Sequence, residues 1–245
     1  MYHRDDPRLP VSEMVLWMNE FVSENKTLRW GVSNWSFARF QEATFYALEH
    51  GLIPPSANSP QFSLAKPFCE IWPTTYSISD VESKLDELKW YGENNVELIC
   101  WEVLAKGFMA VPNLWAKEEV HLKQEHEYEV GSNDWRMFRI QRAYCNDENY
   151  RRRKVACDLA HSSGLSLAQI AMLYPLSTSR DTKISVIAGV DRAQHFDDMA
   201  VLKDLRLSPK EMNKLLGKHT VEDFGVQDID YIPYSSVGFP AAVSA

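Results

Sequence analysis

The sequence predicts an α/β fold built around a parallel sheet. Helical segments with one apolar face alternate with short, β-prone apolar segments along most of the chain, as in proteins made of strand–helix–strand units. About five such units can be counted. Their periodicity alone does not distinguish an open doubly wound sheet from a closed barrel. We expect residues 1–220 to form this unit and residues 221–245 to be an irregular tail.

The first half of the chain supplies two helices and two strands. Apolar residues recur at helical spacing over residues 11–24 and again over residues 37–49, where Gly51 is placed to end the helix. Residues 28–32 lie between these helices and favour a short strand. Residues 54–64 favour a second strand, whose start is interrupted by proline.

The second half continues the alternation on both sides of a long polar segment. A helix is predicted at residues 85–91 and an apolar, β-prone strand at residues 96–101. Residues 110–148 are polar and weakly periodic, so we expect a connection that is mobile in the absence of a ligand. The remaining predicted elements are helices at 149–160, 167–174, 194–202 and from Pro209 onward, and a buried strand at 184–188.

Two of these helices have specific start signals. Ser166 with Gln169, and Ser208 with Glu211, have the spacing of capping boxes, in which each side chain bonds to the backbone of the other residue. The second box has Pro209 at the first helical position, where a missing backbone N–H has no cost. These signals fix two helix starts more firmly than periodicity does.

Composition and charge narrow the class of protein. The net charge of −8 and the pI of about 5.4 argue against a general nucleic-acid or anionic membrane surface. The basic run 151–154 is read as a solvated helix face, with phosphate or partner contact as the alternative. The four cysteines form no CxxC pair, and no apolar run is long enough to span a membrane. We therefore expect free thiols and a cytoplasmic protein.

Metal binding is not expected from the histidines. His121 and His126 lie with acidic neighbours in the long polar segment, where a solvated surface explains them. No other group of His, Cys, Asp and Glu has the spacing of a metal site.

Five segments, taken together and in order, resemble the aldo-keto reductases. Any one of them is weak alone, but their order and spacing match that family from His3 to about Leu216. The matching segments are His3–Pro7 (HRDDP), Trp30–Ser36 (WGVSNWS), Ser59–Leu64 (SPQFSL), Trp101–Gly107 (WEVLAKG), and Leu167–Ala171 with Val186–Val190.

The resemblance implies strands four to eight, with their helices, of a (β/α)8 TIM barrel. The active site of such a barrel lies at the carboxyl ends of the strands. In this alignment the chain starts inside strand four, and only His3 of the family's catalytic residues has a counterpart. The family's catalytic tyrosine, its lysine and an aspartate partner have none. A disordered terminal side chain is the competing interpretation of His3.

The resemblance also implies a nicotinamide site. Ser33 and Asn34 would hold the carboxamide, since an amide side chain offers both a donor and an acceptor. Ser59 stands where the family has a glutamine that also clamps the carboxamide, and Gln61 is the candidate that compensates for it. Trp101 would stack on the nicotinamide ring.

The diphosphate and adenine ends follow from later segments. Leu104, Lys106 and Gly107 would approach the pyrophosphate, while Glu102 departs from the family's serine and must point away from a phosphate. The residues implied at the adenine end are Gly189, Arg192, His195 and Asp198. Asp191 replaces the family's cation for the 2′-phosphate, so NAD(H) is kept as an alternative to NADP(H).

The expected parent function is NADP(H)-dependent reduction of a small aldehyde or ketone. General acid catalysis needs a positioned donor, so we expect little or no turnover by this chain alone. One alternative is a non-catalytic nucleotide-binding or assembly module, and another is an incomplete gene product with no stable function. Unpaired strand edges also predict self-association.

Overall fold

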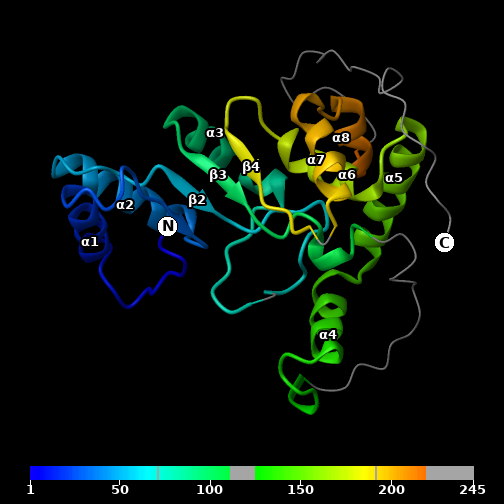
Figure 1. The fold of residues 1–245 in the computed structure, drawn as a ribbon, viewed down its shortest axis with the longest axis horizontal. Helices are drawn as coiled ribbons and strands as arrows, with labels where there is room; N and C mark the ends of the chain where they lie inside the picture. Colours follow the sequence, from blue (N-terminus) through cyan, green and yellow to red (C-terminus); the bar gives the residue numbers. More distant parts are fainter. Residues whose placement is uncertain (71, 111–124, 191, 219–245) are drawn as a thin grey trace.

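The computed structural model describes residues 1–70, 72–110, 125–190 and 192–218. Over these ranges the chain forms a four-stranded parallel sheet in the order β1-β2-β3-β4, with helices before, between and after the strands (Figure 1). The strands are β1 (Val32–Ser33), β2 (Ala57–Ser59), β3 (Glu97–Cys100) and β4 (Ile184–Val186). The α-helices are α1 (Val11–Ser23), α2 (Phe37–Glu49), α3 (Leu85–Glu93), α4 (Asn133–Tyr144), α5 (Asp147–Ser163), α6 (Leu167–Leu176), α7 (Gln194–Ala200) and α8 (Pro209–Leu216). The 3-10 helices are η1 (Val81–Lys84), η2 (Ala105–Gly107), η3 (Glu125–Glu127) and η4 (Val201–Asp204).

The sheet begins with the N-terminal residues. The Tyr2 backbone N–H donates to the Gly31 carbonyl at 2.8 Å, and the Ser33 N–H donates to the Tyr2 carbonyl at 2.9 Å. These bonds make a parallel bridge between Tyr2 and Val32, on the side of β1 away from β2. Gly31 is required here, because a Cβ atom would lie 2.6 Å from the Ala57 carbonyl oxygen.

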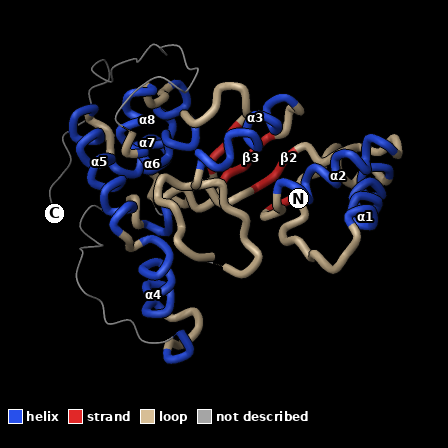
Figure 2. The backbone as a smooth tube through the Cα atoms, turned by 180° about the vertical axis from the view of Figure 1, so that it is seen from behind, coloured by secondary structure: helices blue, strands red, loops and turns tan. Residues whose placement is uncertain are grey.

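The two faces of the sheet are covered to different extents. Along β3, Leu98 and Cys100 are fully buried, whereas Glu97 and Ile99 on the opposite face are half-buried. Helix α3 contacts β3 and helix α6 contacts β4. Helices α1 and α2 lie at one end of the molecule and α5 to α8 at the other, with the sheet between them (Figures 1 and 2).

A partly buried ion pair ties the N-terminal segment to α2. Arg39 Nε donates to Asp5 Oδ1 at 2.7 Å, and the other end of the guanidinium donates to the carbonyls of Asp6 and Leu9. The guanidinium also lies over the Trp35 ring, 5.2 Å from its centroid. These contacts order the chain immediately after His3, which the sequence did not indicate.

Several sequence predictions are confirmed. The capping boxes at Ser166 and Ser208 both form, and Gly51 follows the end of α2 with a left-handed φ of 66°. Strand β3 lies within the predicted 96–101. Helix α7 ends at Ala200 rather than residue 202 and continues as a 3-10 turn.

Three strand predictions need correction. The strand predicted at 28–32 is displaced to Val32–Ser33, because Leu28 and Arg29 face solvent, with Leu28 91% exposed. The strand predicted at 54–64 is only Ala57–Ser59, because Pro60 has no N–H for the ladder. The strand at 184–188 ends at Val186 and is half-buried rather than buried, because β4 is the last strand of the described sheet.

The prediction of a long irregular connection is wrong for residues 133–144. These residues form α4, whose polar arginines mask a buried apolar set that includes Trp135, Phe138 and Ile140. Ser132 caps the helix by accepting a hydrogen bond from the Trp135 N–H. Residues 111–124 and the predicted tail at 221–245 lie outside the described residues.

Candidate functional site

The carboxyl ends of the first three strands meet at one carbonyl group. Ser33 ends β1, Ser59 ends β2, and Trp101 directly follows β3. The Ser59 carbonyl oxygen accepts hydrogen bonds from the Ser33 hydroxyl at 3.0 Å, the Asn34 N–H at 3.0 Å and the Trp101 indole N–H at 3.1 Å. Four of the residues implied by the resemblance are therefore adjacent in space.

Asn34 has an acceptor that the described residues leave unpaired. Its backbone has a left-handed φ of 64°, which asparagine tolerates better than most residues. Its Nδ2 donates to the Ser33 hydroxyl at 3.0 Å, so the amide is oriented by its neighbour. Within the described ranges its Oδ1 is buried without a hydrogen-bond partner, and such atoms are normally satisfied in proteins. An orphan acceptor beside a held donor fits a carboxamide ligand.

Gln61 is engaged inside the protein instead. Its Oε1 accepts from the hydroxyls of Ser77 and Ser79, and its Nε2 donates to Ser63 at 2.8 Å and to the Tyr144 hydroxyl at 3.4 Å. The side chain is buried, and these four contacts use its full hydrogen-bonding capacity. To clamp a ligand in place of Ser59, it would first have to break these contacts.

The loop after Trp101 is unusual in both backbone and charge. Glu102, Ala105 and Lys106 all have positive φ values, between 49° and 57°, a conformation that costs free energy for residues with a Cβ. The Glu102 side chain turns into the protein, where its carboxylate accepts from the Tyr144 hydroxyl at 2.8 Å. Lys106 Nζ lies 3.2 Å from the other carboxylate oxygen. Burial raises the pKa of the Glu102 carboxyl, which Lys106 and Tyr144 partly offset.

A cavity of about 630 Å³ lies beyond the end of β4. Four predicted residues line it, namely Leu104, Gly189, His195 and Asp198. The sequence missed the wall from α6, which includes Ser166, Ala168, Gln169 and Met172. Gln169 Nε2 donates to the Asp198 carbonyl at 2.7 Å and so joins α6 to α7. The capping box was the sequence signal that could have pointed to this wall, since it placed Ser166 and Gln169 at a helix start.

The other predicted residues lie apart from this cavity. His3 and Arg192 are exposed, and neither lines it. Lys106 and Gly107 lie in η2, between the cavity residues Leu104 and Ala110 in sequence, and Gly107 has a φ of 92°. Asp191 lies outside the described residues. The cavity thus gathers Gly189, His195 and Asp198, three of the four residues expected at the adenine end, and the Ser59 carbonyl gathers Ser33, Asn34 and Trp101.

Comparison with known families agrees with the order of these segments. The model of the aldo/keto reductase family matches residues 1–219. The chain belongs to this family. A Schizosaccharomyces pombe protein named "Putative voltage-gated potassium channel subunit beta" is 35% identical over 63 residues, which are 26% of this chain and 18% of that protein.

A solved structure supports the fold of this family member. The crystal structure of a thermostable aldo-keto reductase in complex with the inhibitor epalrestat aligns with a TM-score of 0.56 at 16% sequence identity. The alignment covers 87% of this chain and 56% of that one. This aldo/keto reductase chain therefore spans about half of that neighbour and less than a fifth of the curated relative.

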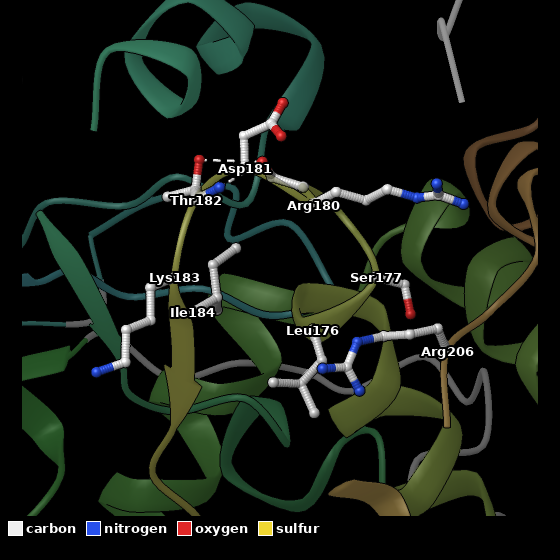
Figure 3. A pocket seen from close by; sticks show the side chains of 9 residues that line it. Leu176, Ser177, Arg180, Asp181, Thr182, Lys183, Ile184 and Arg206 are labelled. Atoms are coloured by element: carbon white, nitrogen blue, oxygen red, sulfur yellow. Dashed lines mark hydrogen bonds between the residues drawn. The ribbon is translucent and has the colours of Figure 1, made fainter. Parts of the chain in front are cut away.

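A second cavity lies at the opposite end of β4. It measures about 460 Å³ and is lined by residues at the end of α6 and the start of β4, with Arg180, Lys183 and Arg206 among them (Figure 3). None of the predicted site residues lines it. Parallel α/β folds bind their ligands at the carboxyl ends of the strands, so we place the candidate site there.

The described residues were also compared with the requirements of a membrane-spanning helix and of a metal site. No described helix combines the length and the apolar character needed to cross a membrane. The described residues also contain no cluster of three or more His, Cys, Asp or Glu side chains placed for a metal ion. Of the two histidines in the polar segment, His126 is exposed and His121 lies outside the described residues.

Proposed function

We propose that this chain carries the nucleotide-binding part of an aldo-keto reductase that uses NADP(H) to reduce a small aldehyde or ketone. The observation that carries this proposal is the buried Asn34 Oδ1 without a partner, held beside Ser33 and Trp101 at the carboxyl ends of the strands. We further propose that Tyr2 and the four strands correspond to strands four to eight of an eight-stranded barrel, in a cytoplasmic protein.

The residues present suit the parts of a nicotinamide dinucleotide. Asn34 would accept from the carboxamide NH2, and the ring of Trp101, fixed through its N–H to Ser59, would lie against the nicotinamide. When bound, the cofactor supplies the hydride. His3, at the same end of the sheet, would donate to the substrate carbonyl.

The loop and the cavity would hold the rest of the dinucleotide. Glycine at position 107 permits close approach of a diphosphate, and Lys106 supplies a cation. Gly189 has no atom near its absent Cβ, which leaves room for an adenine in the cavity. Exposed Arg192 would pair with a 2′-phosphate, so we favour NADP(H), with NAD(H) as the alternative.

A second candidate function is a non-catalytic nucleotide-binding or assembly module. It is favoured by the printed name of the S. pombe relative, a channel subunit rather than a reductase. The two functions share the nucleotide site and differ in turnover. A bound cofactor that is not oxidised by any small aldehyde or ketone would favour the module.

Calorimetric titration with NADPH tests the shared site. Trp101→Ala should weaken binding by about tenfold, because it removes a stacking surface worth about 1 kcal/mol or more. Trp17→Ala is the matched control, since Trp17 is a half-exposed tryptophan on α1. No saturable binding by the unmodified chain, or equal affinities of both variants, would reject the site. Consumption of NADPH with added aldehyde then separates reductase from module.

A further inference from the structure

Glu102 is a buried carboxylate in a loop expected to receive a diphosphate. It directly follows Trp101, and its side chain is only 5% exposed. One carboxylate oxygen accepts from Tyr144 on α4 at 2.8 Å, and the other lies 3.2 Å from Lys106 Nζ. The Glu102 carboxylate therefore already forms an ion pair with Lys106, the cation expected to bind the diphosphate.

Lys106 is restrained from two sides. Besides Glu102, its ammonium lies over the Trp72 ring, 5.0 Å from the centroid. The guanidinium of Arg139 lies 4.9 Å from the centroid of that same ring. Lys106 is still 30% exposed, so a ligand arriving from solvent can reach it.

We propose that Glu102 competes with the nucleotide for Lys106, so that a dinucleotide binds by drawing Lys106 onto its diphosphate while Glu102 takes up one proton from solvent. This inference rests on the proposed nucleotide site and adds to it a dependence on pH. No covalent bond changes. The ion pair is exchanged for a Lys106–diphosphate pair, and the proton neutralises the carboxylate that is left behind in a buried position.

The direction of the pH dependence follows from linkage. Binding removes the Lys106 charge from Glu102 and brings a diphosphate near it, and both changes raise the pKa of the carboxyl. A ligand that raises the pKa of a group binds more tightly where the group is protonated. Affinity should therefore fall as pH rises from the free-state pKa to the bound-state pKa, by at most about tenfold per pH unit for one proton.

Among the described residues, the titratable and charged groups near Glu102 lie on η2, on α4 and at Cys69. Lys106 on η2 and Tyr144 on α4 contact Glu102 directly. Arg139, also on α4, reaches Lys106 through the Trp72 ring, and Cys69 lies near Tyr144. The phosphate groups of the dinucleotide also titrate near neutral pH, so the experiment must subtract their contribution.

The test compares NADPH dissociation constants from about pH 5 to pH 9 for the unmodified chain, Glu102→Gln and Glu97→Gln. Glu102→Gln removes the competing charge, and we expect it to bind about tenfold more tightly at the alkaline end and to lose the Glu102 part of the slope. Glu97→Gln should follow the unmodified chain. It is a matched control because Glu97 lies at the opposite end of β3, the strand that precedes Glu102, and pairs with Lys183 at 2.9 Å.

Tyr144→Phe gives an independent readout if Glu102→Gln does not fold. The Tyr144 hydroxyl stabilises the carboxylate, so its loss raises the pKa of Glu102, and the fall in affinity should move to higher pH. Identical profiles for the unmodified chain and either variant would overturn the competition while leaving the nucleotide site intact. If the unmodified chain binds no NADPH at any pH, the proposed function itself fails.

Discussion

At the scale of single residues, Asn34 combines a conformational and a chemical demand. Its left-handed backbone needs a residue that tolerates positive φ, and its side chain places an unpaired acceptor at the carboxyl ends of the strands. Glycine meets only the first demand and alanine meets neither. The two demands can therefore be separated by substitution.

Asn34→Ala should lower the free energy of unfolding by about 1 kcal/mol, because alanine is strained at this φ. Asn34→Gly should leave stability nearly unchanged. Both variants should bind NADPH more weakly, since both lose the amide. Urea unfolding and calorimetric titration measure the two effects separately. Unchanged NADPH affinity in Asn34→Gly would exclude Asn34 from the nucleotide site.

The sequence identifies residues at strand ends better than it identifies their partners. Ser33, Ser59 and Trp101 could be named because each lies in a segment that resembles an aldo-keto reductase motif. The partner of Glu102 could not, because Tyr144 is 42 positions away and lies on a helix whose arginines conceal its apolar face. The partners of Gln61 could not be predicted for the same reason, since Ser77, Ser79 and Tyr144 are all distant in sequence.

At the scale of elements, local signals predicted helix starts and failed at strand lengths. Capping boxes are satisfied within four residues, so Ser166 and Ser208 determine their helices wherever those helices pack. Strand length depends on which neighbouring strand provides the backbone hydrogen bonds, and that is set by tertiary structure. Pro60 shortens β2, and β4 lacks the burial expected of a central strand.

The junction between the N-terminal segment and α2 gives an element-scale prediction. Arg39 and Asp5 form an ion pair with side chains 16% and 12% exposed, whereas the Arg8–Asp6 pair has the same 2.7 Å distance but an 88% exposed arginine. Arg39→Met should lower the free energy of unfolding by about 2 kcal/mol, because the partly buried Asp5 carboxylate would lose its charged partner.

Arg8→Met is the control for that prediction. Solvent screens the Arg8–Asp6 pair, so its loss should leave the unfolding midpoint in urea unchanged. Equal midpoints for the two variants would show that Arg39 does not anchor the segment that contains His3.

At the scale of the whole molecule, the described sheet has unequal edges. The outer edge of β1 is bridged by Tyr2, whereas β4 is the last strand of the sheet, and the face of β3 that carries Ile99 is only half-buried. Large apolar side chains are also exposed on α1 and α2, including Trp17, Phe21, Phe45 and Leu48. A parallel sheet normally has both faces covered.

These unequal edges predict association between copies of the chain. An unpaired strand edge can add a strand from another molecule, and a charge on that strand opposes such pairing. Light scattering during size-exclusion chromatography should show a mass above one chain that rises with concentration. Ser185→Lys, in the middle of β4, should shift this distribution toward a single chain, whereas Ser162→Lys, on the exposed side of α5, should not. If the unmodified chain runs as a monomer at every concentration, the β4 edge is not used for pairing. If both lysine variants dissociate it equally, net charge rather than strand pairing controls the association.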